Sequence, residues 1–221
     1  MARTAGSEGT RTEAAIREAA VSLIAREGYE GVSMRRLAEA VGVQAGALYR
    51  YFPTKQALLV SMMRAHMRHL IESWRSAKPA GGTPEAALAA FARFHVRYHI
   101  DRRDEVFINY MELRSLDPAN AREIKALRKE YERELRAILA AGRETGAFAL
   151  ADVAVSAMAL IAMLTGVTTW RKAGGRLSPA EIEEVYVGLA LAAVGAGTAP
   201  AEDGAARRPA RAAGAARAAA G

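Results

Sequence analysis

Residues 33–52 carry side chains of the kinds that bind double-stranded DNA. The segment reads SMRRLAEAVGVQAGALYRYF, with one glycine between two short helical patterns. Gln44 can pair bidentately with adenine, and Ala45 can contact the methyl group of thymine. Arg35 and Arg50 can bind phosphate groups, which raises affinity without reading the base sequence. These residue types therefore favour a surface that both holds and reads a DNA groove.

The surrounding sequence predicts helices that would hold this segment in place. From Arg11 to Glu27 apolar residues recur every three to four positions, which predicts one amphipathic helix. Gly28 fits a left-handed helix end, and Ser33 can cap the next helix. Gly42 breaks that second helix, and Pro53 ends a third one. Two short helices joined by a tight turn form a helix-turn-helix, whose second helix enters the major groove of DNA.

The run from Leu48 to Lys55, LYRYFPTK, resembles the signature of the TetR family of transcriptional regulators. The resemblance covers about residues 11–60. It implies that Tyr49 and Lys55 contact DNA phosphates, while the start of the third helix faces base edges. The residues expected to contact DNA are Ser33, Arg35, Gln44, Ala45, Gly46, Ala47, Tyr49, Arg50 and Lys55.

Two observations limit what the resemblance predicts. Many members of the family have Ser at the position of Gln44 and Lys at that of Ala45, so relatives do not predict the operator sequence. For Arg35, ordinary solvation of a helix face is as good an interpretation as a DNA contact.

The remainder of the chain also reads as helices, which predicts an all-α fold. Ser178 and Glu181 form the sequence pattern of a capping box. The predicted helices cover residues 84–100, 104–116, 119–142, 151–171 and 179–195. The predicted organisation is a flexible arm at 1–10, an N-terminal three-helix helix-turn-helix domain at 11–56, a C-terminal helical ligand-binding and dimerisation domain at 57–196, and a disordered tail rich in Ala, Gly and Arg at 197–221.

Aromatic side chains gather between residues 84 and 116 in a chain that is rich in alanine. Large rings beside small residues can leave an apolar cavity, with polar side chains such as Asn109 and Glu112 as anchors for a ligand. Ordinary core packing is the alternative interpretation. The residues predicted to line a ligand pocket are Phe91, Phe94, His95, Tyr98, Phe107, Tyr110, Met111 and Trp170.

The C-terminal half resembles the branch of the TetR family linked to fatty-acid, sterol and acyl-CoA catabolism. The resemblance rests on FHVRYH from Phe94, ELRSLD from Glu112, the spaced Arg128 and Tyr131, GRETGAF from Gly142, and Trp170 followed by GGRLSPAEI. It implies a small-molecule inducer, either a hydrophobic acid or an acyl-CoA. The arginines that could pair with the anionic part of such a ligand are Arg97, Arg102, Arg103 and Arg128. Each of them could alternatively be a solvated surface charge.

The last two predicted helices are expected to form the interface of a homodimer. Small residues let helices approach closely, and two helices from each subunit would make a four-helix interface. The expected interface residues are Val155, Met158, Ile161, Ala162, Thr165, Ile182, Val185, Tyr186, Leu189 and Ala193. A two-fold dimer would place its recognition helices about 34–36 Å apart, or a multiple of this, on a roughly palindromic operator. The helix from Thr54 to about Ser76 is the expected lever between ligand and DNA.

Composition supports a DNA-binding protein and limits other classes. With 31 Lys and Arg against 24 Asp and Glu, the chain has a formal net charge of +7, which favours polyanionic partners. The absence of cysteine excludes thiol catalysis, thiolate metal sites and disulfides, and it fits a cytoplasmic protein. No cofactor and no metal are expected.

Three alternatives stay open at this level. The pairs His66 with His69 and His95 with His99 could bind a metal in an enzyme, although neither has an obvious third ligand. The arginines of the tail, from Arg207 onward, could belong to a non-specific nucleic-acid-binding protein. Residues 151–170 carry only one charge, yet their Ala, Ser, Thr and Gly favour a buried interface helix over a membrane span.

Overall fold

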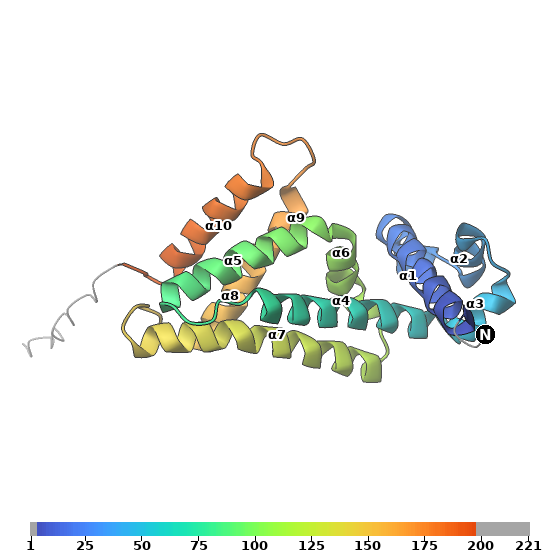
Figure 1. Cartoon of the computed structure of the whole chain (residues 1–221), viewed down its shortest axis with the longest axis horizontal. Helices are drawn as coiled ribbons and strands as arrows, with labels where there is room; N and C mark the ends of the chain where they lie inside the picture. Colours follow the sequence, from blue (N-terminus) through green and yellow to red (C-terminus); the bar gives the residue numbers. More distant parts are fainter. Residues whose placement is uncertain (1–3, 198–221) are drawn as a thin grey trace, which may run out of the picture.

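The computed structural model describes residues 4–197 of the chain, with the side chains of residue 9 and residues 11–197. Helices make up the described part, which contains no strand, and this confirms the all-α class. The elements are α1 (Thr4–Gly31), α2 (Met34–Val41), α3 (Ala45–Tyr51), α4 (Lys55–Ala77), α5 (Pro84–Asp101), α6 (Arg103–Met111), the 3-10 helix η1 (Glu112–Ser115), α7 (Pro118–Glu144), α8 (Val153–Thr165), α9 (Val167–Trp170) and α10 (Pro179–Ala193). In Figure 1, α1 to α3 form one end of the molecule, and α4 leads from them along α7 into the larger helical part.

Capping residues set the ends of the helices around the helix-turn-helix. Gly28 bends α1 with φ 75°, and Gly42 ends α2 with φ 74°, a left-handed region that glycine enters without steric cost. The Ser33 hydroxyl accepts a hydrogen bond from the Arg36 amide at 3.1 Å and caps α2. Gln44 then occupies the N-cap position of α3. The predicted cap by Ser33 and the predicted left-handed helix end at Gly42 are therefore confirmed, whereas Gly28 forms a kink with ψ 157° and α1 continues past it to Gly31.

The apolar core beneath the helix-turn-helix continues into the larger part of the molecule. Leu37 and Leu48 are fully buried, and Ile108 of α6 belongs to the same cluster. The second apolar cluster begins at Met67, so the two clusters divide along α4 after Met63. The predicted boundary at residue 56 stays a prediction, because the N-terminal helices share their core with α4 and α6.

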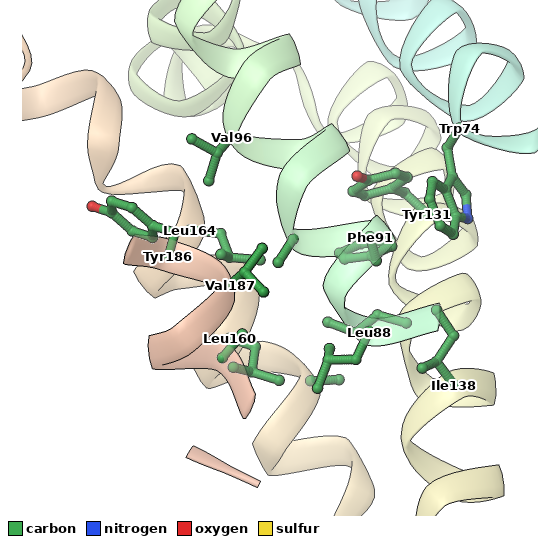
Figure 2. Close-up of a cluster of buried hydrophobic side chains, with 14 of the residues drawn as sticks. Trp74, Leu88, Phe91, Val96, Tyr131, Ile138, Leu160, Leu164, Tyr186 and Val187 are labelled. Carbon is green, nitrogen blue, oxygen red and sulfur yellow. The ribbon is translucent and has the colours of Figure 1, made fainter. Parts of the chain in front are cut away.

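The second cluster joins α4, α5, α7, α8 and α10. Figure 2 shows Phe91 of α5 close to Trp74 of α4 and Tyr131 of α7. The Trp74 and Phe91 ring centroids lie 5.0 Å apart in an edge-to-face arrangement, and those of Phe91 and Tyr131 lie 5.3 Å apart. Such ring pairs stabilise the packing beyond the area that they bury. On the other side of α5, Val187 of α10 closes the core.

Two predicted segments differ from the structure. Residues 4–10 continue α1, whereas a flexible arm is predicted there; extending an existing helix avoids the cost of nucleating a new one. Residues 151–171 do not form one helix, because Gly166, a poor helix former, separates α8 from α9. Apart from Gly197, the predicted disordered tail with its arginines lies outside the described residues.

Gly142 of α7 packs against the ring of Phe148, which is buried. We expect Gly142→Ala to lower the free energy of unfolding by about 1–3 kcal/mol, since the added methyl group would overlap this ring. Without the overlap, alanine in a helix would instead raise stability. Urea denaturation measures the difference. Phe148→Leu in the Gly142→Ala background should recover part of the lost stability. If Gly142→Ala alone is as stable as the parent, the Phe148 ring moves aside at no measurable cost, and the expectation is wrong.

Candidate DNA-binding face and ligand cavity

Helix α3 presents a small, partly polar face to solvent. Tyr49 is 48% exposed, whereas its neighbour Leu48 is fully buried and fixes the rotation of the helix. Gln44 makes no capping hydrogen bond to α3, so its side-chain amide is available to a base. Of the residues predicted on this helix, the exposed ones are Gln44, Gly46, Tyr49 and Arg50, and the half-buried ones are Ala45 and Ala47.

The other predicted DNA contacts are engaged within the protein. Ser33 is exposed, but its hydroxyl caps α2. Arg35 is exposed and lies 3.7 Å from Glu39, one turn further along the helix. The Lys55 ammonium lies 4.1 Å from the centroid of the Tyr29 ring and donates a hydrogen bond to the Glu30 carbonyl at 3.4 Å. Lys55 would therefore exchange contacts with the end of α1 for a phosphate group.

A cavity of about 250 Å³ lies between α4, α5, α6, α7 and α8. Its wall combines apolar side chains with a few polar ones, as ligand sites commonly do. The lining residues are His66, Met67, Leu70, His95, His99, Asn109, Tyr110, Arg128, Tyr131, Glu132, Met158, Ile161 and Ala162. Among these, Tyr110, Met158 and Ala162 are exposed, so the cavity opens beside α8.

Of the eight residues predicted to line the pocket, His95 and Tyr110 do so. Phe91 is fully buried in the apolar core, where Phe94 also packs. Phe107, Met111 and Trp170 are 43%, 50% and 52% exposed and lie outside the cavity wall. Helical periodicity placed Phe91, Phe94, Phe107 and Met111 on broad apolar faces, but it does not separate a core position or an exposed position from a cavity wall.

Tyr98, also predicted in the pocket, lines a different hollow. This open groove of about 720 Å³ runs between α1, α4 and the turn from α5 to α6. The Tyr98 hydroxyl lies 2.8 Å from Nδ1 of His69. Positively and negatively charged side chains line the groove, among them Arg17, Glu18 and Asp101. Its mixed charge favours no single class of ligand.

Buried neutral histidines form the inner end of the cavity. His95 lies 3.1 Å from the Tyr131 hydroxyl through Nδ1 and 3.0 Å from the Thr165 hydroxyl through Nε2. The rings of His95 and His99 stack 3.7 Å apart. Burial lowers the pKa of His99 to about 4 and the pKa of His95 well below its usual value, and it also lowers the pKa of His66 to about 3. All three are therefore uncharged at neutral pH.

These hydrogen bonds weaken the alternative interpretation in which His95 and His99 bind a metal ion. Both ring nitrogens of His95 already have partners, and Nδ1 of His99 lies 2.8 Å from the His95 carbonyl. Within the described part of the chain, no group of three or more His, Cys, Asp or Glu is placed to hold a metal ion.

Glu112 connects the two parts of the molecule. The sequence predicts Glu112 as a ligand anchor in the cavity. Glu112 is buried, at 7% exposed, but it does not line the cavity. Its carboxylate accepts a hydrogen bond from the Tyr29 amide at 3.1 Å and another from the Ser115 hydroxyl at 2.8 Å. The Gln56 side chain at the start of α4 donates to the Ser115 carbonyl. No sequence pattern signals the contacts of Glu112 with Tyr29 and of Gln56 with Ser115, because the two residues of each pair lie far apart along the chain.

Helices α8 and α10 each leave an apolar face exposed. Val155 and Met158 on α8, and Val185 and Leu189 on α10, are all about half exposed. Three of the predicted interface residues, Thr165, Ile182 and Tyr186, are instead buried within the chain. On α10, Ile182 and Tyr186 belong to the core of the chain, while the predicted Val185, Leu189 and Ala193 are exposed; the dimer interface itself stays a prediction.

The stretch Val153–Trp170 is long and apolar enough to cross a membrane, with a mean hydropathy of 1.8. Only 28% of it is buried within the chain. The turn at Gly166 divides it into α8 and the short α9, and Asp152 caps the start of α8. This shape fits a helix with one packed and one exposed side better than a continuous span.

The chain matches two family models. The one described as "Bacterial regulatory proteins, tetR family" covers residues 16–62, and the one described as "Tetracyclin repressor-like, C-terminal domain" covers residues 81–194. A curated relative, the HTH-type transcriptional repressor KstR of Mycolicibacterium smegmatis, is 41% identical over 80 residues, which are 36% of this chain. The match spans 39% of that relative's length.

Solved structures resemble nearly the whole described chain. A tetR-family regulatory protein from Rhodococcus RHA1 superposes with a TM-score of 0.80 at 27% identity, covering 84% of this chain and 97% of that one. AibR, solved in complex with isovaleryl coenzyme A and operator DNA, has a TM-score of 0.74 at 28% identity and covers 80% and 97%. The C-terminal family model alone covers just over half of the sequence, and the chain belongs to the TetR family of bacterial transcriptional regulators.

Proposed function

We propose that this chain is a homodimeric repressor, released from a palindromic operator by a small hydrophobic ligand, either an organic acid or its acyl-CoA. The observation that carries the proposal is a continuous connection from the cavity to the DNA-binding helices. Asn109 and Tyr110 line the cavity, and the chain runs from them directly into η1. There Glu112 binds the amide of Tyr29 at the end of α1.

This connection gives the ligand a means to act on DNA binding. A ligand that shifts α6 shifts Glu112 as well, and with it the end of α1, a helix that packs against α2 of the helix-turn-helix. If the ligand prefers a conformation in which the recognition helices are misplaced, it weakens operator binding, and the operator weakens ligand binding by the same coupling free energy.

The solved complex of AibR supports this class of ligand. That protein was crystallised with isovaleryl coenzyme A and operator DNA, and it shares this fold at 28% identity. The cavity here has apolar walls from Met67, Leu70 and Ile161 that suit an acyl group. Its volume of about 250 Å³ suits a short chain.

The exposed faces of α8 and α10 support a homodimer. Val155, Met158, Val185 and Leu189 are apolar, and packing them against a second copy removes them from water. A two-fold axis through this four-helix interface would present two α3 helices to successive turns of the major groove. We place this dimer in the cytoplasm, where operator DNA is accessible.

The variants Gln44→Ala and Lys55→Ala, both at predicted DNA contacts, should change DNA binding in different ways. Gln44→Ala should change which base is preferred at one operator position, at a cost of about 1–3 kcal/mol for the preferred base. Lys55→Ala should weaken binding to every duplex and reduce the dependence of affinity on salt. Fluorescence anisotropy on operator variants at several salt concentrations measures both. Arg133→Ala, an exposed arginine far along α7, serves as the control, and identical profiles for all three would contradict the assigned roles.

Ligand response is tested on a genomic operator selected by its binding to the purified protein. Isovaleryl coenzyme A or a short-chain acid should abolish the gel shift, while the dimer persists in light scattering, because the ligand changes its geometry and not its assembly. A shift that survives every acid and acyl-CoA would remove this ligand class. A monomer with equal affinity for any duplex would refute the proposed function as a whole.

A further inference from the structure

Arg128 is a half-buried cation in the cavity wall that has no carboxylate partner. Its guanidinium donates a hydrogen bond to the Asn109 carbonyl and lies 4.8 Å from the centroid of the Tyr110 ring. Among the described residues, no Asp or Glu forms an ion pair with it. Burial keeps water from the guanidinium, and this lowers the pKa of Arg128.

Other arginines of the same helical part meet carboxylates. Arg97 pairs with the buried Glu183 at 2.6 Å, so this candidate for anion binding is already occupied. Arg93 holds Glu184 through two hydrogen bonds of 2.6 and 2.9 Å. Of the remaining candidates, Arg102 and Arg103 line the open groove and not the cavity of about 250 Å³. Arg128 alone among the four predicted arginines faces that enclosed space.

The other titratable groups of the cavity leave the charge of Arg128 uncompensated. Glu132 also lines the cavity, but its carboxylate binds Arg136 at 2.6 Å. His66, His95 and His99 are uncharged at neutral pH for the reasons given above. A buried charge without a partner is costly, and an arginine fork binds a carboxylate through two parallel hydrogen bonds.

The size and opening of the cavity restrict what can bring such an anion. At about 250 Å³ it lies just below the usual range of ligand sites, about 300–1,000 Å³. It opens beside Met158 and Ala162, on the face of α8 that the proposed partner copy covers. A small acid fits inside entirely, whereas the nucleotide of a coenzyme A ester would have to leave through the dimer interface.

We propose that Arg128 binds the carboxylate of a small monocarboxylic acid whose apolar tail fills the cavity, and that the free acid is the preferred ligand over its coenzyme A thioester. The inference rests on the proposed function and specifies its ligand. The charged head lies at the mouth, between Arg128 and Tyr110, and the tail extends toward Met67 and Leu70. A thioester carbonyl accepts hydrogen bonds but carries no charge to compensate the guanidinium.

The test uses calorimetric titration of the full-length protein with isovalerate, hexanoate and octanoate, and with the methyl ester and coenzyme A thioester of isovalerate. At least one acid should bind, and the matching ester should bind about ten- to a hundredfold more weakly, as expected for a lost hydrogen bond to a charged group. Arg128→Gln should lose the same factor for the acid, Arg128→Lys should lose less, and Arg133→Gln, exposed on the same helix, should bind as the parent does.

Thermal unfolding without ligand separates folding from binding. Removing an uncompensated cation should leave the melting temperature of Arg128→Gln close to that of the parent, so that a lost affinity reports on the ligand. Equal affinity for acid and ester, unchanged acid binding by Arg128→Gln, or no acid binding at all would overturn the inference. Operator release by isovaleryl coenzyme A alone would overturn it as well, while the proposed ligand-responsive function would stand.

Discussion

The proposed coupling between ligand and DNA depends on the hydrogen bond between the Glu112 carboxylate and the Tyr29 amide. This hydrogen bond is the point where a buried charge in the ligand-binding part meets the backbone of the DNA-binding part. A carboxylate taken out of water must keep its hydrogen bonds, and Ser115 supplies the other one. Because Glu112 follows α6 directly, the DNA-binding helices are held by an element that also forms the cavity wall.

Neighbouring contacts extend this connection toward the DNA. Tyr29 lies beneath the Lys55 ammonium, so the residue that Glu112 fixes is also the one that holds a proposed phosphate contact. Gln56, next to Lys55, binds Ser115 of η1. On the other side, Arg128 binds the carbonyl of Asn109 in the last turns of α6. A continuous series of contacts therefore connects Arg128, α6, η1 and the start of α4. Ligand binding and operator binding would both act on this series of contacts.

The sequence predicts the DNA-binding part well and the ligand site poorly, for a physical reason. Ser33, Gly42 and Pro53 act through bonds and steric limits within a few residues, so local sequence shows them directly. The cavity depends on which side of each helix meets its neighbours. Periodicity marked Phe91 and Phe107 as pocket residues, yet one is in the core and the other is on the surface, whereas Arg128 was one of four arginines predicted to pair with a ligand anion.

The central claim, that Glu112 transmits ligand binding to the DNA-binding helices, is tested most directly by the ligand response of Glu112→Met. The measurement is the ratio of operator affinities with and without the acid or thioester that releases the parent protein, with the exposed Glu72→Met as the matched control. The account predicts that this ratio, typically about 5- to 150-fold in coupled systems, falls toward one in Glu112→Met and is unchanged in Glu72→Met. A Glu112→Met protein that folds, binds the ligand and keeps the full ratio would contradict it.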